Sequence, residues 1–168
     1  MIKNFTIIVL LLLSGVCGCS NGSKLSGLVP ANGELQVNGK VMAGATISFN
    51  PVNESRAASA ITDANGKFKA MTLNPADGIY PGEYVITVTK IEERGEIKEI
   101  AVKDEKERND QNIEDTREII EHIPQKYVAR DTSDLKITIP NEGDKNITLN
   151  LTGEVDLTPK KVKDLKKQ

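Results

Sequence analysis

The stretch from Glu34 to Pro51, "ELQVNGKVMAGATISFNP", alternates apolar and polar residues with a period of two. Such alternation is typical of β-strands that bury one face. Asn38 and Gly39 separate two alternating runs, and both residue types accept the positive φ that a two-residue hairpin turn needs. Pro51 ends the second run because it has no N–H for a sheet. The stretch predicts a hairpin whose inward side chains are Leu35, Val37, Ala45, Ile47 and Phe49.

The same alternation recurs downstream. "ASAITDANGKFKAMT" (58–72) predicts a second hairpin around the turn Asp63–Gly66, and "GIYPGEYVITVTKI" (78–91) predicts a type II turn at Pro81-Gly82 followed by a strand. "LKITIP" (135–140) and "NITLNLTG" (146–153) predict two more strands, joined by a polar hairpin loop at 141–145. About seven short strands predict an all-β fold, an immunoglobulin/transthyretin-like antiparallel β-sandwich. Further inward positions are Phe68, Ala70, Tyr84, Ile86, Val88, Leu135, Ile137, Ile139, Ile147, Leu149 and Leu151.

The chain divides into four parts by composition. Residues 1–18 are interpreted as a lipoprotein signal peptide and 19–33, rich in Ser, Gly and Asn, as a flexible tether. Residues 34–152 are the predicted sandwich, and 153–168 form a Lys-rich C-terminal tail. We expect the tail to be solvated or a frayed helix, with attraction to an anionic lipid surface as the functional alternative.

The N-terminus has the layout of an export signal, with Lys3 before the apolar run "FTIIVLLLL". The run is too short to span a membrane, which takes about 20 apolar residues. "VCGC" then resembles the bacterial lipoprotein box, with Val16 at −3 and Gly18 at −1 from Cys19. Cys17 is the poorer target because β-branched Val16 would stand directly before it. We therefore expect Cys19 to be the lipidated residue.

The lipoprotein box implies a location. Family chemistry attaches a diacylglycerol and an amide-linked acyl chain such as palmitate, which together anchor a protein stably. Ser20 rather than Asp follows Cys19, a pattern that resembles an outer-membrane address. We expect a lipid-anchored protein of the bacterial cell envelope, on the periplasmic face or the cell surface of the outer membrane.

A charged insertion interrupts the strand pattern at residues 92–123. Residues 92–121 contain 12 acidic and 6 basic side chains. Ile97, Ile100 and Ala101 have helical spacing, as do Ile113 and Ile120, so the spacing predicts a partly helical insertion with a solvated middle. Such a segment is either a docking arm for a partner protein or a tolerated surface loop.

Several function classes have little support in the sequence. The net charge of −2 does not favour nucleic-acid binding. Asp63–Gly66 lacks the Glu that closes a calcium loop, so a turn is expected. His122, near Glu118 and Glu121, is interpreted as a solvated histidine. We therefore expect that the protein has no catalytic residues, no metal site and no cofactor, and that it is not an enzyme.

Three motifs together carry a family resemblance. "VNGKVMAGATISFNP", "AITDANGKFKAMT" and "PGEYVITVTK" resemble the carboxypeptidase regulatory-like domain, a transthyretin-like sandwich. "IPQKYVARDTSDLKITI" is similar to small bacterial lipoproteins that carry this domain alone. The resemblance covers residues 34–152 and implies a structural, non-catalytic module. Its motifs are structural, so no functional residue transfers.

These patterns favour a non-catalytic, lipid-anchored envelope module with a binding or structural role. Its expected partner is a protein. The alternative is a carbohydrate-binding accessory lipoprotein, whose ligand would be an envelope polysaccharide. Sugar sites usually offer flat aromatic rings, and only Tyr80 and Tyr127 fall outside the inward positions. We expect Tyr127 to pack over the edge of the sandwich, so no ligand-binding residue is assigned.

Overall fold

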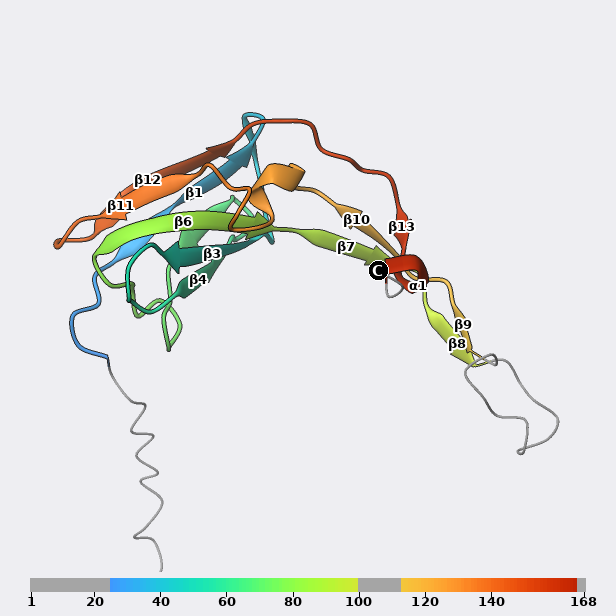
Figure 1. The fold of residues 1–168 in the computed structure, drawn as a ribbon, viewed down its shortest axis with the longest axis horizontal. Coiled ribbons are helices and arrows are strands. Elements are labelled where there is room, and N and C mark those ends of the chain that lie inside the picture. Colours follow the sequence, from blue (N-terminus) through green and yellow to red (C-terminus); the bar gives the residue numbers. More distant parts are fainter. Residues whose placement is uncertain (1–24, 100–112, 166–168) are drawn as a thin grey trace, which may run out of the picture.

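The structure is a computed structural model that describes residues 25–99 and 113–165. Most of these residues lie in short strands (Figure 1). The described helical elements are one 3-10 turn, η4 (Gln125–Tyr127), and one single-turn helix, α1 (Val162–Leu165). The predicted all-β class is therefore confirmed.

One sheet is built around the first strand of the body, β1 (Ala31–Val37). β1 pairs with β12 (Asp144–Leu151) on one side, and with both β2 (Lys40–Val41) and β5 (Lys67–Lys69) on the other. The β1–β12 pairing is parallel, whereas β2 and β5 run antiparallel to β1. The first and last strands of the body thus lie side by side.

The second sheet is antiparallel throughout, in the order β11-β6-β3-β4. Its strands are β11 (Lys136–Ile139), β6 (Gly82–Thr89), β3 (Thr46–Pro51) and β4 (Ala58–Ile61). β3 and β6 are paired along their whole shared length, from Thr46↔Thr89 to Pro51↔Tyr84. This pair is the centre of the second sheet.

Inward side chains of both sheets form a single hydrophobic core. Phe49 of β3 contacts Phe68 of β5 at 6.1 Å and Tyr84 of β6 at 6.3 Å between ring centroids, so aromatic packing joins the two sheets. The buried Tyr84 hydroxyl donates to the carbonyl of Tyr80 at 2.8 Å. The predicted inward positions are confirmed as buried, except Leu135 and Ile137, which are half-buried against the core.

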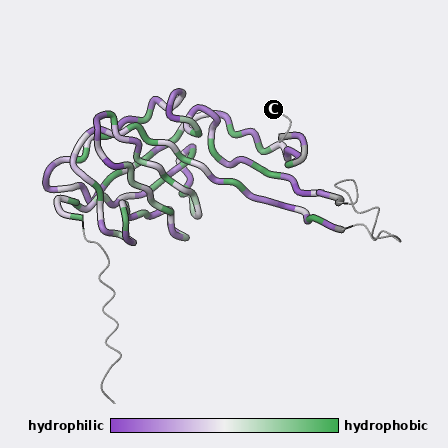
Figure 2. The backbone as a smooth tube through the Cα atoms, turned by 60° about the horizontal axis from the view of Figure 1, so that its bottom comes forward, coloured by the Kyte–Doolittle hydropathy of each residue, from purple (hydrophilic) through white to green (hydrophobic). Residues whose placement is uncertain are grey.

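The charged insertion is a β-ribbon in its described part. The chain continues from β6 into β7 (Ile91–Arg94) and β8 (Ile97–Glu99) and returns through β9 (Ile113–Asp115) and β10 (Glu118–Glu121). The ribbon projects away from the two sheets (Figures 1 and 2). The predicted helix is wrong there because β10 and β9 pair antiparallel with β7 and β8 in one continuous register. Residues 100–112 of the insertion lie outside the described residues.

The C-terminal tail returns to this ribbon. β13 (Lys160–Lys161) pairs antiparallel with β10, which gives a three-stranded sheet β13-β10-β7, and α1 follows. Val155 packs against the core on the way. Most described side chains of the tail are exposed and it ends in a single helical turn, but β13 and Val155 attach it to the arm and the body.

Two predicted hairpins connect different sheets. The turn at Asp63–Gly66 forms, but the strand before it, β4, pairs with β3, and the strand after it, β5, pairs with β1. A single bridge, Ser59↔Met71, joins the two sides of this predicted hairpin. The loop 141–145 likewise leads from β11 in one sheet to β12 in the other. Both hairpin predictions fail for one reason: a local turn does not decide which distant strand each of its flanking strands pairs with.

Other local predictions have mixed outcomes. The hairpin turn is confirmed at Asn38 and Gly39, whose φ angles are 51° and 76°. Gly82 has the expected positive φ, but at 146° it begins β6 instead of closing a type II turn. The predicted tether ends too late, because β1 begins at Ala31 and Val29 already bridges to Ile79.

Candidate functional site

The predicted lipidation site, Cys19, lies outside the described residues, so its role stays a prediction. His122 lies at the end of β10, and its Nε2 is 3.1 Å from Oε2 of Glu92 instead of approaching Glu118 or Glu121. Hydrogen bonds from Arg94 and His122 hold the pKa of Glu92 below its ordinary value. Oδ1 of Asp63 accepts from the N–H groups of Asn65 and Lys67, as a turn requires.

Neither acidic groups nor aromatic rings gather into an obvious site. Within residues 25–99 and 113–165, no group of three or more His, Cys, Asp or Glu could hold a metal ion. Tyr127 is buried as expected, and its hydroxyl lies 3.2 Å from the N and 3.4 Å from the O of Thr152. Tyr80 is half-buried, so the described chain offers no exposed pair of rings for a sugar.

Two features of the structure remain as candidates, and the first is the projecting ribbon formed by β7–β10, here called the arm. β7 pairs with β10 and β8 pairs with β9 in the same register, on either side of an interruption at Gly95 and Glu96. Odd-numbered residues share one face within each pair. Ile91 lies on this face of the first pair and Ile97 on this face of the second, with 57% and 51% of their surface exposed. Exposed aliphatic side chains on a projecting element are suited to contact with a partner.

Between these isoleucines the arm face is held by Arg117. Its Nε donates to Oδ1 of Asp115 and its Nη2 to Oδ2, both at 2.8 Å, while Nη1 donates to Glu93 across the ribbon at 3.2 Å. Hydrogen bonds to Asp115 come first among the causes that raise the pKa of Arg117. Gly95 stands opposite Arg117, where a Cβ would lie 2.9 Å from the carbonyl carbon of Thr116. The guanidinium therefore fixes the two strands to each other.

The C-terminal strand supports the arm from the side. Lys160 lies 3.7 Å from Glu121 on β10 and 3.8 Å from Asp156, and the N–H of Val162 donates to the carbonyl of Arg117 at 3.0 Å. Lys160 of the tail thus meets the acidic ribbon at Glu121. An isolated two-stranded ribbon is only marginally stable in water, so the third strand and the Arg117 bridge keep the arm ordered.

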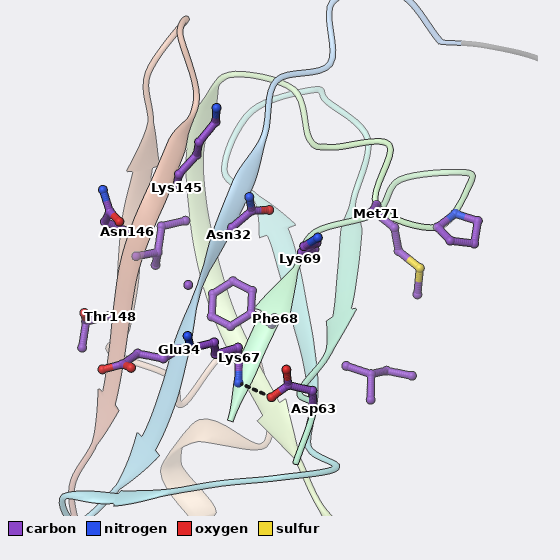
Figure 3. A pocket seen from close by; sticks show the side chains of 15 residues that line it. Asn32, Glu34, Asp63, Lys67, Phe68, Lys69, Met71, Lys145, Asn146 and Thr148 are labelled. Carbon is purple, nitrogen blue, oxygen red and sulfur yellow. Dashed lines mark hydrogen bonds between the residues drawn. The ribbon is translucent and has the colours of Figure 1, made fainter. Parts of the chain in front are cut away.

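The second candidate is a hollow of about 690 Å³ on the outer face of the sheet β5-β1-β12 (Figure 3). Outward side chains of all three strands line it, since Glu34 of β1 stands opposite Lys67 of β5 and Thr148 of β12. Asn32 stands opposite Lys69 in the next outward row. Apolar residues of the neighbouring strand and loop form one lip: Ile61, Met71, Pro75 and Ala76.

The hollow contains more free cations than free anions. Among the described residues, no ion pair or hydrogen bond engages the ammonium groups of Lys67, Lys69 and Lys145 or the side-chain amides of Asn32 and Asn146. Its two carboxylates accept hydrogen bonds from neutral groups and keep their charge: Glu34 accepts from the Gln36 amide at 3.0 Å, and Asp63 accepts from backbone N–H groups of its turn. The three lysines therefore exceed them by one charge. The surface can therefore receive an anion.

Sequence reasoning located the arm as a charged insertion but missed the hollow. The three lysines lie on two strands that are about 75 positions apart in the chain, and only the parallel pairing of β12 with β1 brings them to one face. Outward alternation of Lys67, Lys69 and Asn146 was visible, but no local signal joined them.

Comparison of the chain with protein-family models, with curated proteins and with solved structures found no match. In the described part of the chain, no helix has the length and apolar character needed to cross a bilayer.

Proposed function

We propose that this protein is a lipid-anchored, transthyretin-like β-sandwich of the bacterial envelope that docks a protein partner through its arm and catalyses no reaction. The lipid on Cys19 holds the body at the membrane, and the sandwich positions the arm away from its own core. The exposed isoleucines of the arm provide the contact surface, while Arg117 keeps that surface in one conformation.

Strand order supports the transthyretin-like assignment over an immunoglobulin one. A constant-type immunoglobulin domain places its first, second, fourth and fifth strands in one sheet. Here the seven main strands divide differently, because β1 shares a sheet with β5 and β12 while β3, β4, β6 and β11 form the other. The motifs "VNGKVMAGATISFNP" and "PGEYVITVTK" supply β2, β3 and β6, so the sequence resemblance falls on structural elements of this body.

The projecting arm is the observation that carries the docking proposal. It extends from the end of β6 and away from the body (Figure 1). Its Ile91 and Ile97 side chains are exposed, and surface ion pairs of Arg117 stabilise it. Surface ion pairs contribute only about 0–1 kcal/mol each, so such an arm adds little to the stability of the body. A binding role explains why the chain builds it.

The arm is tested with the variant Ile91→Lys/Ile97→Lys in the intact lipoprotein, by in-cell crosslinking followed by mass spectrometry. We expect one dominant protein crosslinked to the wild type and at least a tenfold loss of that product in the variant, because two ammonium groups cannot enter an apolar contact. Both positions are more than half exposed, so the body should fold normally.

Val41→Lys is the matched control, since Val41 is an equally exposed aliphatic residue, at 57%, on β2 of the body. It should leave the crosslinked product unchanged. Equal yields from the wild type and the arm variant would show that the partner binds elsewhere.

The lipid anchor is tested separately by metabolic acyl labelling. Cys19→Ser should abolish the label, whereas Cys17→Ser should keep it, because Cys17 leaves with the signal peptide. Persistent labelling of the Cys19 variant, or loss in the Cys17 variant, would contradict the assignment.

A further inference from the structure

We propose that the hollow on the outer face of β5-β1-β12 is a second binding site, one that takes an acidic saccharide. This site lies on the body and does not involve the arm, so it stands or falls independently of the docking proposal. Its ligand class follows from three properties of the surface: its charge, its mixture of hydrogen-bonding groups and the strand pairing of its backbone.

The charge of the hollow selects an anion. Three lysines, Lys67, Lys69 and Lys145, face the carboxylates of Glu34 and Asp63, so the hollow has an excess of one positive charge. This excess attracts a carboxylate or phosphate, which the ammonium groups can bind without giving up another partner in the described chain. The charged part of the ligand therefore belongs between β5 and the start of β12.

The hydrogen-bonding groups select hydroxyls. The amides of Asn32 and Asn146 both donate and accept, and Thr148 adds a hydroxyl. Glu34 accepts from Gln36 through Oε1, which leaves Oε2 to accept from a ligand. Sugar hydroxyls also donate and accept, so they can satisfy such a mixed surface. Figure 3 shows these side chains on neighbouring strands of the sheet.

The backbone argues against a peptide. A peptide usually binds a sheet by adding a strand to a free edge. β1, which forms the centre of the hollow, is paired with β5 on one side and β12 on the other, so among the described strands a peptide could be added only along the outer edge of β12 or β5 and not at the centre. Recognition has to come from side chains, while the lip of Met71, Pro75 and Ala76 offers an apolar contact for a sugar ring.

The site is tested by isothermal titration of the mature lipoprotein in detergent with trigalacturonic acid, a short saccharide with one carboxylate per ring. We expect saturable binding with one ligand per chain. Maltotriose, which is neutral, should bind at least tenfold more weakly. No binding of trigalacturonic acid, or equal binding of both sugars, would overturn the proposal.

Two triple variants distinguish the effect of charge at the site from the effect of the protein's overall charge on binding. Lys67→Gln/Lys69→Gln/Lys145→Gln should weaken binding at least tenfold. Lys40→Gln/Lys136→Gln/Lys161→Gln removes the same charge from exposed lysines outside the hollow and should leave binding within twofold of wild type. Equal weakening in both variants would reduce the effect to general electrostatics.

Saccharide recognition is separated from anion binding with hexaglutamate as a second probe. Asn32→Ala/Asn146→Ala should weaken trigalacturonic acid about tenfold, while Asn150→Ala, an exposed outward amide beyond the hollow on β12, should not. Hexaglutamate binding as tight as that of the sugar, or insensitivity of the sugar to the amide variant, would mark the hollow as a site for acidic peptides.

Discussion

Gly33 shows how much a single residue decides in this fold. It lies on β1 directly opposite Ile147 of β12, at a register shift between Ala31 and Gly33. A Cβ at Gly33 would overlap the carbonyl oxygen of Ile147 and lie 2.8 Å from its Cβ. The close approach of the first and last strands therefore depends on the missing side chain.

Gly33→Ala should lower the free energy of unfolding by about 3 kcal/mol, because the two paired strands must separate to admit a methyl group. Urea denaturation measures this. Gly39→Ala is the control: no atom lies within 4 Å of a Cβ there, so only the φ of 76° costs stability, about 1 kcal/mol. A Gly33 variant as stable as wild type would show that β1 and β12 are not so closely paired.

Asp77 organises the loop between β5 and β6. Its carboxylate accepts from the N–H groups of Thr72 at 2.7 Å, Asn74 at 2.8 Å and Leu73 at 3.0 Å. Burial by itself would raise the pKa of Asp77, but these backbone donors outweigh it and hold the pKa below its ordinary value. The charged form is therefore the one that stabilises the folded loop.

Asp77→Ala should cost about 1–2 kcal/mol of unfolding free energy at pH 7. The folded pKa is lower than the unfolded one, so this contribution is complete above the unfolded pKa of about 4 and disappears as the pH falls through the folded pKa. Urea denaturation at pH 7 and at pH 2.5 should show the difference from wild type shrinking. A difference that is constant with pH would contradict the role of the charge.

Among the elements, the arm is the one whose stability is separate from the core. Its strands contribute exposed or half-buried side chains over most of their length, and within the described residues the core cluster contains none of the side chains of β7 or β8. Ion pairs and the third strand, β13, stabilise the arm, whereas burial of apolar side chains stabilises the body. Such an element opens locally at a lower free energy than the body.

Arg117→Met should therefore loosen the arm without unfolding the body. Hydrogen exchange at the amides of Thr116 and Val162 should become about fivefold faster, the factor that corresponds to a local loss of about 1 kcal/mol, while the urea midpoint stays unchanged. Arg94→Met is the control, because Arg94 pairs with Glu92 on its own strand and links no strands. Equal effects of both variants would show that cross-strand bridging is not what orders the arm.

At the scale of the whole molecule, the chain closes its body with β12 and then sends its C-terminus to the arm. Lys160 of the tail meets the acidic ribbon at Glu121, 3.7 Å away, and lies 3.8 Å from Asp156 within the tail itself. The tail therefore acts as a strap between body and arm, with Val155 packed at the body end.

Truncation after Thr158 removes β13 and α1, and we expect it to speed hydrogen exchange in β10 several-fold while leaving the urea midpoint of the body within experimental error. Truncation after Leu165 is the control, since it removes residues 166–168, two of them lysines, but keeps β13. A clear drop in the urea midpoint on the first truncation would show that the tail is part of the cooperative body.

Local sequence patterns were enough to identify which residues face the core and where the tightest turn lies. Alternation identified Leu35, Ile47 and Ile86 as buried, and Asn38-Gly39 identified the hairpin, because side-chain direction and turn conformation depend on neighbouring residues. The sequence also located the arm, though with the wrong conformation: helical spacing of a few isoleucines is a weak signal against strand pairing over a long register.

The partners of each strand, in contrast, follow from the packing of the folded chain. The parallel pairing of β1 with β12, the division of β4 and β5 between two sheets, and the addition of β13 to the arm all join residues that are far apart in the chain or not paired with their sequence neighbours. The hollow follows from these pairings, since its lysines reach one face only when β5, β1 and β12 are side by side. Such contacts depend on the packing of the whole core, and no local pattern encodes them.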